Sequence, residues 1–208
     1  MGIKNLLKLG CILVFSAFFS AVSGQSSDDL ALKEIEKHRK EQTATLKSKT
    51  SPLPIKERKK FKGLKYYPAN LNYRVEATFV KHNTPVLFKM KTTTTRLPDY
   101  IKYGEAHFTI QNQNFVLEVY QSPDVSKMKG YENHLFIPFT DETNGEETYE
   151  VGRYIDITIP TDDKIILDFN LSYNPYCSYN ANYSCPIPPE ANHLSIAITA
   201  GEMKYKKR

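Results

Sequence analysis

The sequence has no long apolar run after its first 24 residues, and it contains only three cysteines in 208 residues. A helix that crosses a bilayer needs about 20 consecutive apolar residues. We therefore expect no transmembrane segment in the chain beyond residue 24, and a soluble product once the leading segment has been removed.

A basic excess is also absent from the folded part of the chain. Residues 28 to 65 hold twelve Lys or Arg against six Asp or Glu, whereas residues 66 to 208 hold fourteen against seventeen. A nucleic-acid-binding domain carries its basic residues on the folded module. The net charge of +5 therefore resides in the amino-terminal arm, and we expect no nucleic-acid partner.

The first 24 residues have the order of a secretory signal peptide. Lys4 and Lys8 precede an apolar run over residues 11 to 21, which ends in small residues up to Gly24. This order predicts export to the periplasm or the extracellular space, with cleavage after Gly24. A lipid anchor on Cys11 is disfavoured, because Cys11 precedes the apolar run. Cleavage would leave two cysteines in an oxidising compartment.

The remaining chain divides by composition and periodicity. Residues 25–50 are rich in helix-forming residues and predict a surface helix, and residues 51–65 form a basic, proline-containing linker. Residues 66–208 show the two-residue period of strands. They predict a mainly β, single antiparallel domain of about eight strands, either barrel-like or a sandwich. The expected strands are 73–79, 86–96, 105–110, 115–120, 135–139, 153–159, 165–169 and 194–199, with a four-residue hairpin loop at 111–114.

Residues 168–192 form the most distinctive segment, with four tyrosines, five asparagines and two cysteines but no glycine or lysine. Tyrosine offers a flat apolar face with a polar tip, and asparagine offers both a donor and an acceptor, so the mixture suits a small polar ligand. The alternative is a long loop that satisfies its own backbone. The candidate ligand-binding residues are Arg153 from the preceding strand and Asp168, Asn170, Tyr173, Asn174, Tyr179 and Asn192.

Cys177 and Cys185 admit three interpretations. A disulfide is favoured, since both thiols would be exported together. The alternative is a zinc site, for which His193 is the nearest further ligand, although the spacing matches no usual zinc pattern. A catalytic thiol is the third possibility, but no histidine belongs to a thiol-enzyme signature.

The acidic turn ahead of Arg153 is a second candidate site. By strand register Arg153 points toward the core, where it needs either a carboxylate or a bound anion. Glu146, Asp168 and Glu190 are its possible partners, and Glu146 and Glu190 are also the candidate general bases of a hydrolase.

Two long series, LFIPFTDETNGEETYEVGRYIDI and LDFNLSYNPYCSYNANYSCPIPPEANHLSIAITAGEMKY, resemble the bacterial and archaeal family called domain of unknown function 1684. The resemblance covers about residues 29 to 205. The resemblance implies no established activity. In addition to the disulfide, it implies a metal-binding or thiol role as an interpretation of the two cysteines.

These observations predict an exported binding module for a small polar or glycan-like ligand, with its pocket between residues 141–153 and 168–192. The alternatives are a metal-assisted or thiol-dependent hydrolase and a structural envelope protein. No cofactor is expected, with zinc as the alternative.

Overall fold

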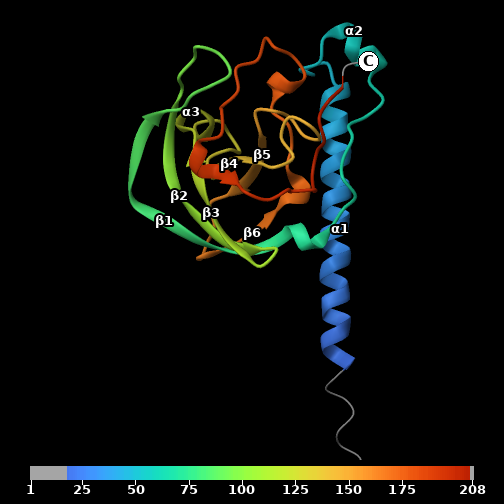
Figure 1. Ribbon diagram of the computed structural model, residues 1–208, viewed down its shortest axis with the longest axis vertical. Helices are drawn as coiled ribbons and strands as arrows, with labels where there is room; N and C mark the ends of the chain where they lie inside the picture. The colour runs from blue at the N-terminus through green and yellow to red at the C-terminus, as the bar shows by residue number, and fades with distance from the viewer. Residues whose placement is uncertain (1–17, 207–208) are drawn as a thin grey trace, which may run out of the picture.

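A computed structural model describes the backbone of residues 18–206 and the side chains of residues 27–206 (Figure 1). Its centre is one curled, half-barrel sheet in the order β5-β4-β3-β2-β1-β6, and a short strand β7 adds to β4. All pairs are antiparallel except β4 with β7. The strands are β1 Arg74–Lys89, β2 Asp99–Ile110, β3 Gln113–Gln121, β4 His134–Asp141, β5 Arg153–Thr158, β6 Lys164–Asp168 and β7 His193–Leu194. The predicted mainly β, barrel-like fold is confirmed.

Two predicted features of the sheet differ in detail. Residues 74–79 and 86–89 of the two predicted strands belong to one strand, β1, whose register with β2 shifts between Lys81 and Val86. The strand predicted at 86–96 ends at Lys89, and residues 90–96 lie outside the sheet strands. The hairpin loop has two residues rather than four, because Ile110 already pairs with Gln113. Gln111 and Asn112 have φ of 52° and 60°, as a two-residue hairpin turn with both central residues in the left-handed region requires.

The carboxy-terminal segment completes the core on the inner face of the sheet. Leu194, Ile196, Ile198 and Ala200 are buried and alternate with exposed residues, as in a strand. Only His193–Leu194 joins the hydrogen-bonded ladder, so the strand predicted at 194–199 is much shorter. The rest of the segment is held by side chains and by isolated backbone hydrogen bonds, such as that from the Glu142 N–H to the Ile196 carbonyl at 3.2 Å. This determines the geometry of the predicted site.

Helix α1 (Phe18–Lys47) stands beside the sheet and extends past its lower edge in the view of Figure 1. Ala31, Ile35 and Leu46 are buried against the domain, whereas Leu30 and Leu32 are exposed. A single narrow apolar stripe thus attaches the helix. The other helices are short: α2 Ile55–Lys60, α3 Pro123–Ser126, η1 Leu71–Tyr73, η2 Phe169–Leu171, η3 Tyr176–Ser178 and η4 Glu190–Asn192.

The predicted signal peptide lies mostly outside the described residues, so its cleavage stays a prediction. Within residues 18–206, no helix combines the length and the apolarity that crossing a bilayer demands.

Candidate functional site

Arg153 lies in the core, as its strand register predicted, and forms part of a closed contact. Its side chain is fully buried and pairs with Asp141, also fully buried, at 2.8 Å. The guanidinium donates further hydrogen bonds to the carbonyls of Ile198, at 2.9 Å, and of Ala200. Asp141 in turn accepts from the backbone N–H of Ile198 at 3.2 Å. We call these four residues the Arg153 clasp; the partner is none of the three carboxylates expected from the sequence.

Asp168 and Asn170 hold a different part of the chain. Asn170 accepts from the backbone N–H of Asn70 and donates to the Asn70 carbonyl, both at 2.9 Å. Asp168 accepts from Asn170 and from Arg74, at 3.2 Å for the latter. Both side chains are buried, so they fix the entry to the sheet and leave no polar face toward solvent.

Asn174 and Tyr179 converge on Glu202, a carboxylate that the sequence analysis missed. Glu202 is fully buried and accepts from the Asn174 amide at 2.8 Å and from the Tyr179 hydroxyl at 2.5 Å. Burial raises the pKa of Glu202 to about 7, against the opposing effect of these donors. Its position could have been found from the alternation of the carboxy-terminal segment, because residue 202 continues the buried series 194, 196, 198 and 200.

Asn192 also has an architectural position, while the two candidate bases are exposed. The Asn192 side chain accepts from the Glu118 N–H at 2.7 Å and donates to the carbonyls of Glu118, at 2.9 Å, and Pro138, at 2.7 Å. Glu146 and Glu190 are both solvent-exposed. The structure therefore does not gather Glu146, Glu190 and Arg153 into one acid-base site.

The two loops that were expected to enclose a pocket do meet, but their contact is packed. The Tyr149 hydroxyl lies 3.5 Å from the Cys177 sulfur. Gly152, with φ of +119°, lies so close to its neighbours that an added Cβ would sit 2.8 Å from the Pro188 ring and 2.5 Å from the Phe139 carbonyl oxygen. The cavity of interest has a different lining, which includes no residue of 141–153.

That cavity, which we call the tyrosine cavity, has a volume of about 260 Å³. Its lining comes from the 168–192 segment, from β2, β4 and β5, and from Ser122 and Val125. Five tyrosines from three parts of the chain, β2, β5 and the 168–192 segment, line it: Tyr100, Tyr154, Tyr173, Tyr176 and Tyr183. Their rings form edge-to-face pairs, with Tyr154 and Tyr173 at 5.9 Å and Tyr176 and Tyr183 at 5.3 Å. Of the predicted residues, Tyr173 and Cys185 line this cavity.

A polar cluster stands in the tyrosine cavity. His134 Nε2 lies 3.1 Å from one oxygen of Asp156, and the Tyr173 hydroxyl donates to the other oxygen at 2.8 Å. Burial raises the pKa of Tyr173 well above its ordinary value, so Tyr173 stays protonated and donates. The remaining ring nitrogen of His134, Nδ1, is buried and has no hydrogen-bond partner among the described residues.

Cys177 and Cys185 are neighbouring thiols in this structure. The backbone N–H of Cys177 donates to the Cys185 sulfur at 3.2 Å. A hydrogen bond between the thiols lowers the pKa of Cys177 to about 6, and the same bond, together with burial, raises the pKa of Cys185. The disulfide stays a prediction.

His193 is engaged elsewhere. It lies 3.3 Å from Glu142 and 3.0 Å from the Thr140 hydroxyl. Within residues 27–206, no three His, Cys, Asp or Glu side chains are arranged to hold a metal ion. The zinc alternative therefore lacks a third ligand beside the two cysteines in this part of the chain.

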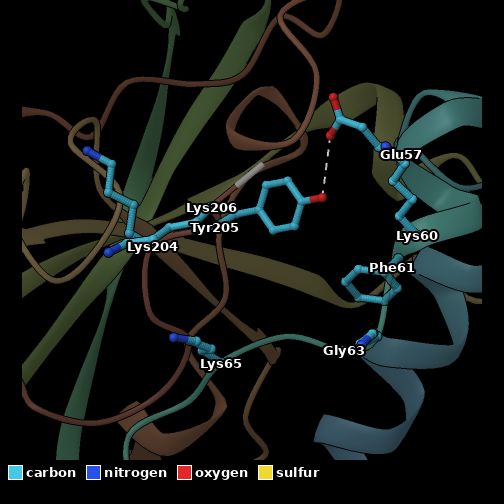
Figure 2. Close-up of a pocket in the computed structure, with 9 residues that line it drawn as sticks. Glu57, Lys60, Phe61, Gly63, Lys65, Lys204, Tyr205 and Lys206 are labelled. Carbon is cyan, nitrogen blue, oxygen red and sulfur yellow. Dashed lines mark hydrogen bonds between the residues drawn. The ribbon is translucent and has the colours of Figure 1, made fainter. Parts of the chain in front are cut away.

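A second cavity of about 170 Å³ lies between the linker after α2 and the carboxy-terminal residues (Figure 2). Its lining is basic and includes Lys60, Lys65 and Lys204. Lys204 is already paired with Glu150 at 3.1 Å, and the Tyr205 hydroxyl bonds to Glu57 at 3.4 Å across the opening, as Figure 2 shows. Mobile lysine side chains supply charge but little shape, so the tyrosine cavity is the better-defined site.

The comparisons with known proteins support the fold and indicate no activity. A solution NMR structure of an uncharacterised protein from Haloarcula marismortui matches with 35% identity and a TM-score of 0.67, and the match covers 86% of this chain and 96% of that one. No curated protein sequence matches the chain. The model of a protein family of unknown function, DUF1684, matches residues 59–203. The chain therefore belongs to the DUF1684 family.

Proposed function

We propose that the protein is a binding module that holds one small polar ring compound, such as a sugar, in the tyrosine cavity. The observation that carries the proposal is the partly exposed cluster of His134, Asp156 and Tyr173 in the lining of a cavity walled by tyrosines. A few polar side chains that converge in a largely apolar cavity orient a bound small molecule, and a ligand hydroxyl or amide would hydrogen-bond to them.

The walls of the cavity support a flat or ring-shaped ligand. Tyrosine rings present large apolar faces that lose little conformational entropy on binding, and their hydroxyls remain available as hydrogen-bonding tips. The volume of about 260 Å³ lies just below the usual range of about 300 to 1,000 Å³ for small-molecule pockets. A ligand of about one ring therefore fits better than an extended chain.

The polar cluster supports recognition of a neutral, hydroxylated ligand. Asp156 is the one carboxylate in the lining, and it already accepts from Tyr173 and contacts His134. A bound ligand thus meets one carboxylate that is already engaged, one imidazole and several hydroxyls, which together both donate and accept. Because Glu146 and Glu190 are not in the lining, the proposal is binding and not hydrolysis.

Export is part of the same proposal, since the order of basic, apolar and small residues up to Gly24 supports it. A module that captures a small nutrient or cell-wall fragment would act outside the cytoplasm. Detection of the chain in the periplasmic or culture fraction, with a new amino terminus after Gly24, is the expected result. An uncleaved chain in the cytoplasm would contradict export and would leave the proposal of sugar binding unaffected.

The binding test is an NMR titration of the full chain with glucose, N-acetylglucosamine and glycerol. We expect shifts at the tyrosine cavity with at least one sugar and none with glycerol, which has hydroxyls but no ring. His134→Gln should weaken the binding about tenfold or more, as the loss of a buried hydrogen bond of about 1.4 kcal/mol would. His107→Gln is the matched control, because His107 also pairs with a carboxylate, Glu105 at 3.2 Å, but lies outside the cavity lining. Equal effects of the two substitutions, or no shifts with either sugar, would refute the assignment.

A further inference from the structure

We propose that Cys177 and Cys185 are a reversible dithiol–disulfide couple that exchanges with low-molecular-weight disulfides, with Cys177 as the attacking thiol and Cys185 as the resolving thiol. This inference does not depend on ligand binding in the tyrosine cavity. It rests on the position, burial and hydrogen bonding of the two sulfurs.

The fold holds the two sulfurs against each other from independent anchors. Cys177 lies in the short helix η3 (Tyr176–Ser178), and its backbone N–H donates to the Cys185 sulfur at 3.2 Å. Cys185 lies in an extended stretch that is fixed to Thr93: its N–H donates to the Thr93 hydroxyl at 3.2 Å, and its carbonyl accepts from the Thr93 N–H at 2.9 Å. The pair is thus assembled while both cysteines are still reduced.

The two thiols differ in the way that an exchange reaction requires. Cys177 is half-buried, whereas Cys185 is 6% exposed and reaches solvent only through the wall of the tyrosine cavity, so an incoming disulfide meets Cys177 more easily. Cys177 also faces the donors that stabilise a thiolate: the Cys185 thiol and the Tyr149 hydroxyl, which lies 3.5 Å from its sulfur. Burial raises the pKa of Tyr149, so that hydroxyl remains a donor. A thiolate stabilised in this way is the nucleophile in thiol–disulfide exchange.

The reaction balances with one disulfide molecule, RSSR. The Cys177 thiolate attacks one sulfur of RSSR, a Cys177–SR bond forms, the RS–SR bond breaks, and RS⁻ leaves and takes up the proton that Cys177 had released. Cys185 then loses its proton and attacks the Cys177 sulfur, which expels the second RS⁻, and this takes up the Cys185 proton. Two protein thiols are oxidised to one disulfide, and RSSR is reduced to two RSH. The reverse sequence regenerates the dithiol.

The test uses the full chain with Cys11→Ser, so that two thiols remain, and oxidised glutathione as the disulfide. We expect Cys185→Ser to accumulate a mixed disulfide with glutathione at Cys177, and Cys177→Ser to accumulate far less at Cys185. Intact-mass measurement and peptide mapping after acid quenching distinguish these adducts. The chain with both thiols should form the internal disulfide and return to the dithiol in excess reduced glutathione. A bridge that resists reduced glutathione, or adducts that form faster on Cys185, would overturn the proposal.

A second measurement tests whether Cys177 reacts because its thiolate is stabilised and not only because it is exposed. It requires no cysteine substitution. The rate of iodoacetamide labelling of reduced Cys177 should rise with a midpoint near pH 6, while Cys185 stays unlabelled in the native chain. Tyr149→Phe should move the midpoint upward, because it removes one donor to the Cys177 sulfur. Tyr176→Phe is the matched control beside Cys177 and should leave the midpoint unchanged. A midpoint above pH 8 in the unsubstituted chain would contradict the assignment.

Discussion

The Arg153 clasp and the tyrosine cavity are built from neighbouring strands, yet they differ in whether their polar groups stay accessible. In the clasp, the side chains of Arg153 and Asp141 are fully buried, and their hydrogen-bond partners come from the chain itself. In the tyrosine cavity, the side chains of His134 and Asp156 are 21% and 45% exposed, and the walls remain open. The difference teaches that a dense polar motif can be entirely architectural, and that a binding site is recognised by the polar groups that the fold leaves accessible.

The largest expected effect is the loss of the clasp. Removing one member of a buried ion pair leaves the other charge uncompensated and destabilises a protein by about 3–5 kcal/mol. Arg153→Met should therefore lower the free energy of unfolding by that amount in urea titrations, while leaving sugar binding intact at temperatures where the variant is folded. Lys164→Met is the control, because its pair with Glu76 lies at the surface, and it should change the unfolding midpoint little. Similar midpoints for the two variants would show that the clasp does not hold the carboxy-terminal segment.

The next effect concerns the pH dependence of stability through Glu202. Its folded pKa is raised from 4.5 to about 7, so between these values the folded state holds a proton that the unfolded state has lost. Stability from this group is therefore present at low pH and falls as the pH rises toward 7, by roughly 3 kcal/mol in total. Glu202→Gln should flatten the unfolding free energy between pH 5 and pH 8, whereas Glu190→Gln at the surface should keep the wild-type slope. An unchanged slope in Glu202→Gln would exclude the assignment.

A smaller effect is expected at Asn192, which bridges β3 and β4 by three hydrogen bonds to backbone groups. Asn192→Ala leaves those groups buried without partners and should lower the free energy of unfolding by about 2–3 kcal/mol. Asn182→Ala, at an exposed position in the same segment, is the control and should have little effect. Chemical unfolding at pH 7 measures both. An Asn192→Ala variant with unchanged stability but weakened sugar binding would contradict the architectural role of Asn192.

The smallest stability effect is expected in the tyrosine cavity. Tyr176 is 43% exposed, so Tyr176→Ala should change the free energy of unfolding by no more than about 1 kcal/mol. The same substitution removes one wall of the cavity and should weaken sugar binding clearly in the NMR titration. A variant that loses stability and keeps its binding would reverse the distinction between the two regions.

Much of the sheet could be predicted from the sequence because its strands have one buried face. The alternation in residues 153–159 placed Arg153 on the inner face, and the structure confirms this orientation. The partner of Arg153 was not predicted, since the pattern of one strand does not say which carboxylate a neighbouring strand brings. Phe139 pairs with Arg153 in the sheet, and Asp141 follows it by two residues on the same face. The register between β4 and β5, which identifies Asp141 as the partner of Arg153, could not be read from the sequence.

The tyrosine cavity could not be predicted from any single stretch. Its lining comes from β2, the 122–125 turn, β4, β5 and the 168–192 segment, and these meet only in the folded sheet. The sequence singled out the tyrosines and asparagines of 168–192 together, but Asn170, Asn174 and Asn192 bind the backbone or Glu202 and not solvent. Composition identified the segment, whereas the division between supporting and lining side chains depends on which face each residue takes.

The way in which residues 194–202 close the core has a consequence for biosynthesis. These residues fill the inside of a half-barrel whose other strands are all made earlier, and Arg153 and Asp141 complete their bonds only with residues from this last stretch. A nascent chain that stops short of residue 198 therefore exposes an apolar trough, in which Arg153 and Asp141 lack their partners from this stretch. Such an intermediate is prone to aggregate. Final compaction of this domain must wait until that stretch has left the ribosome.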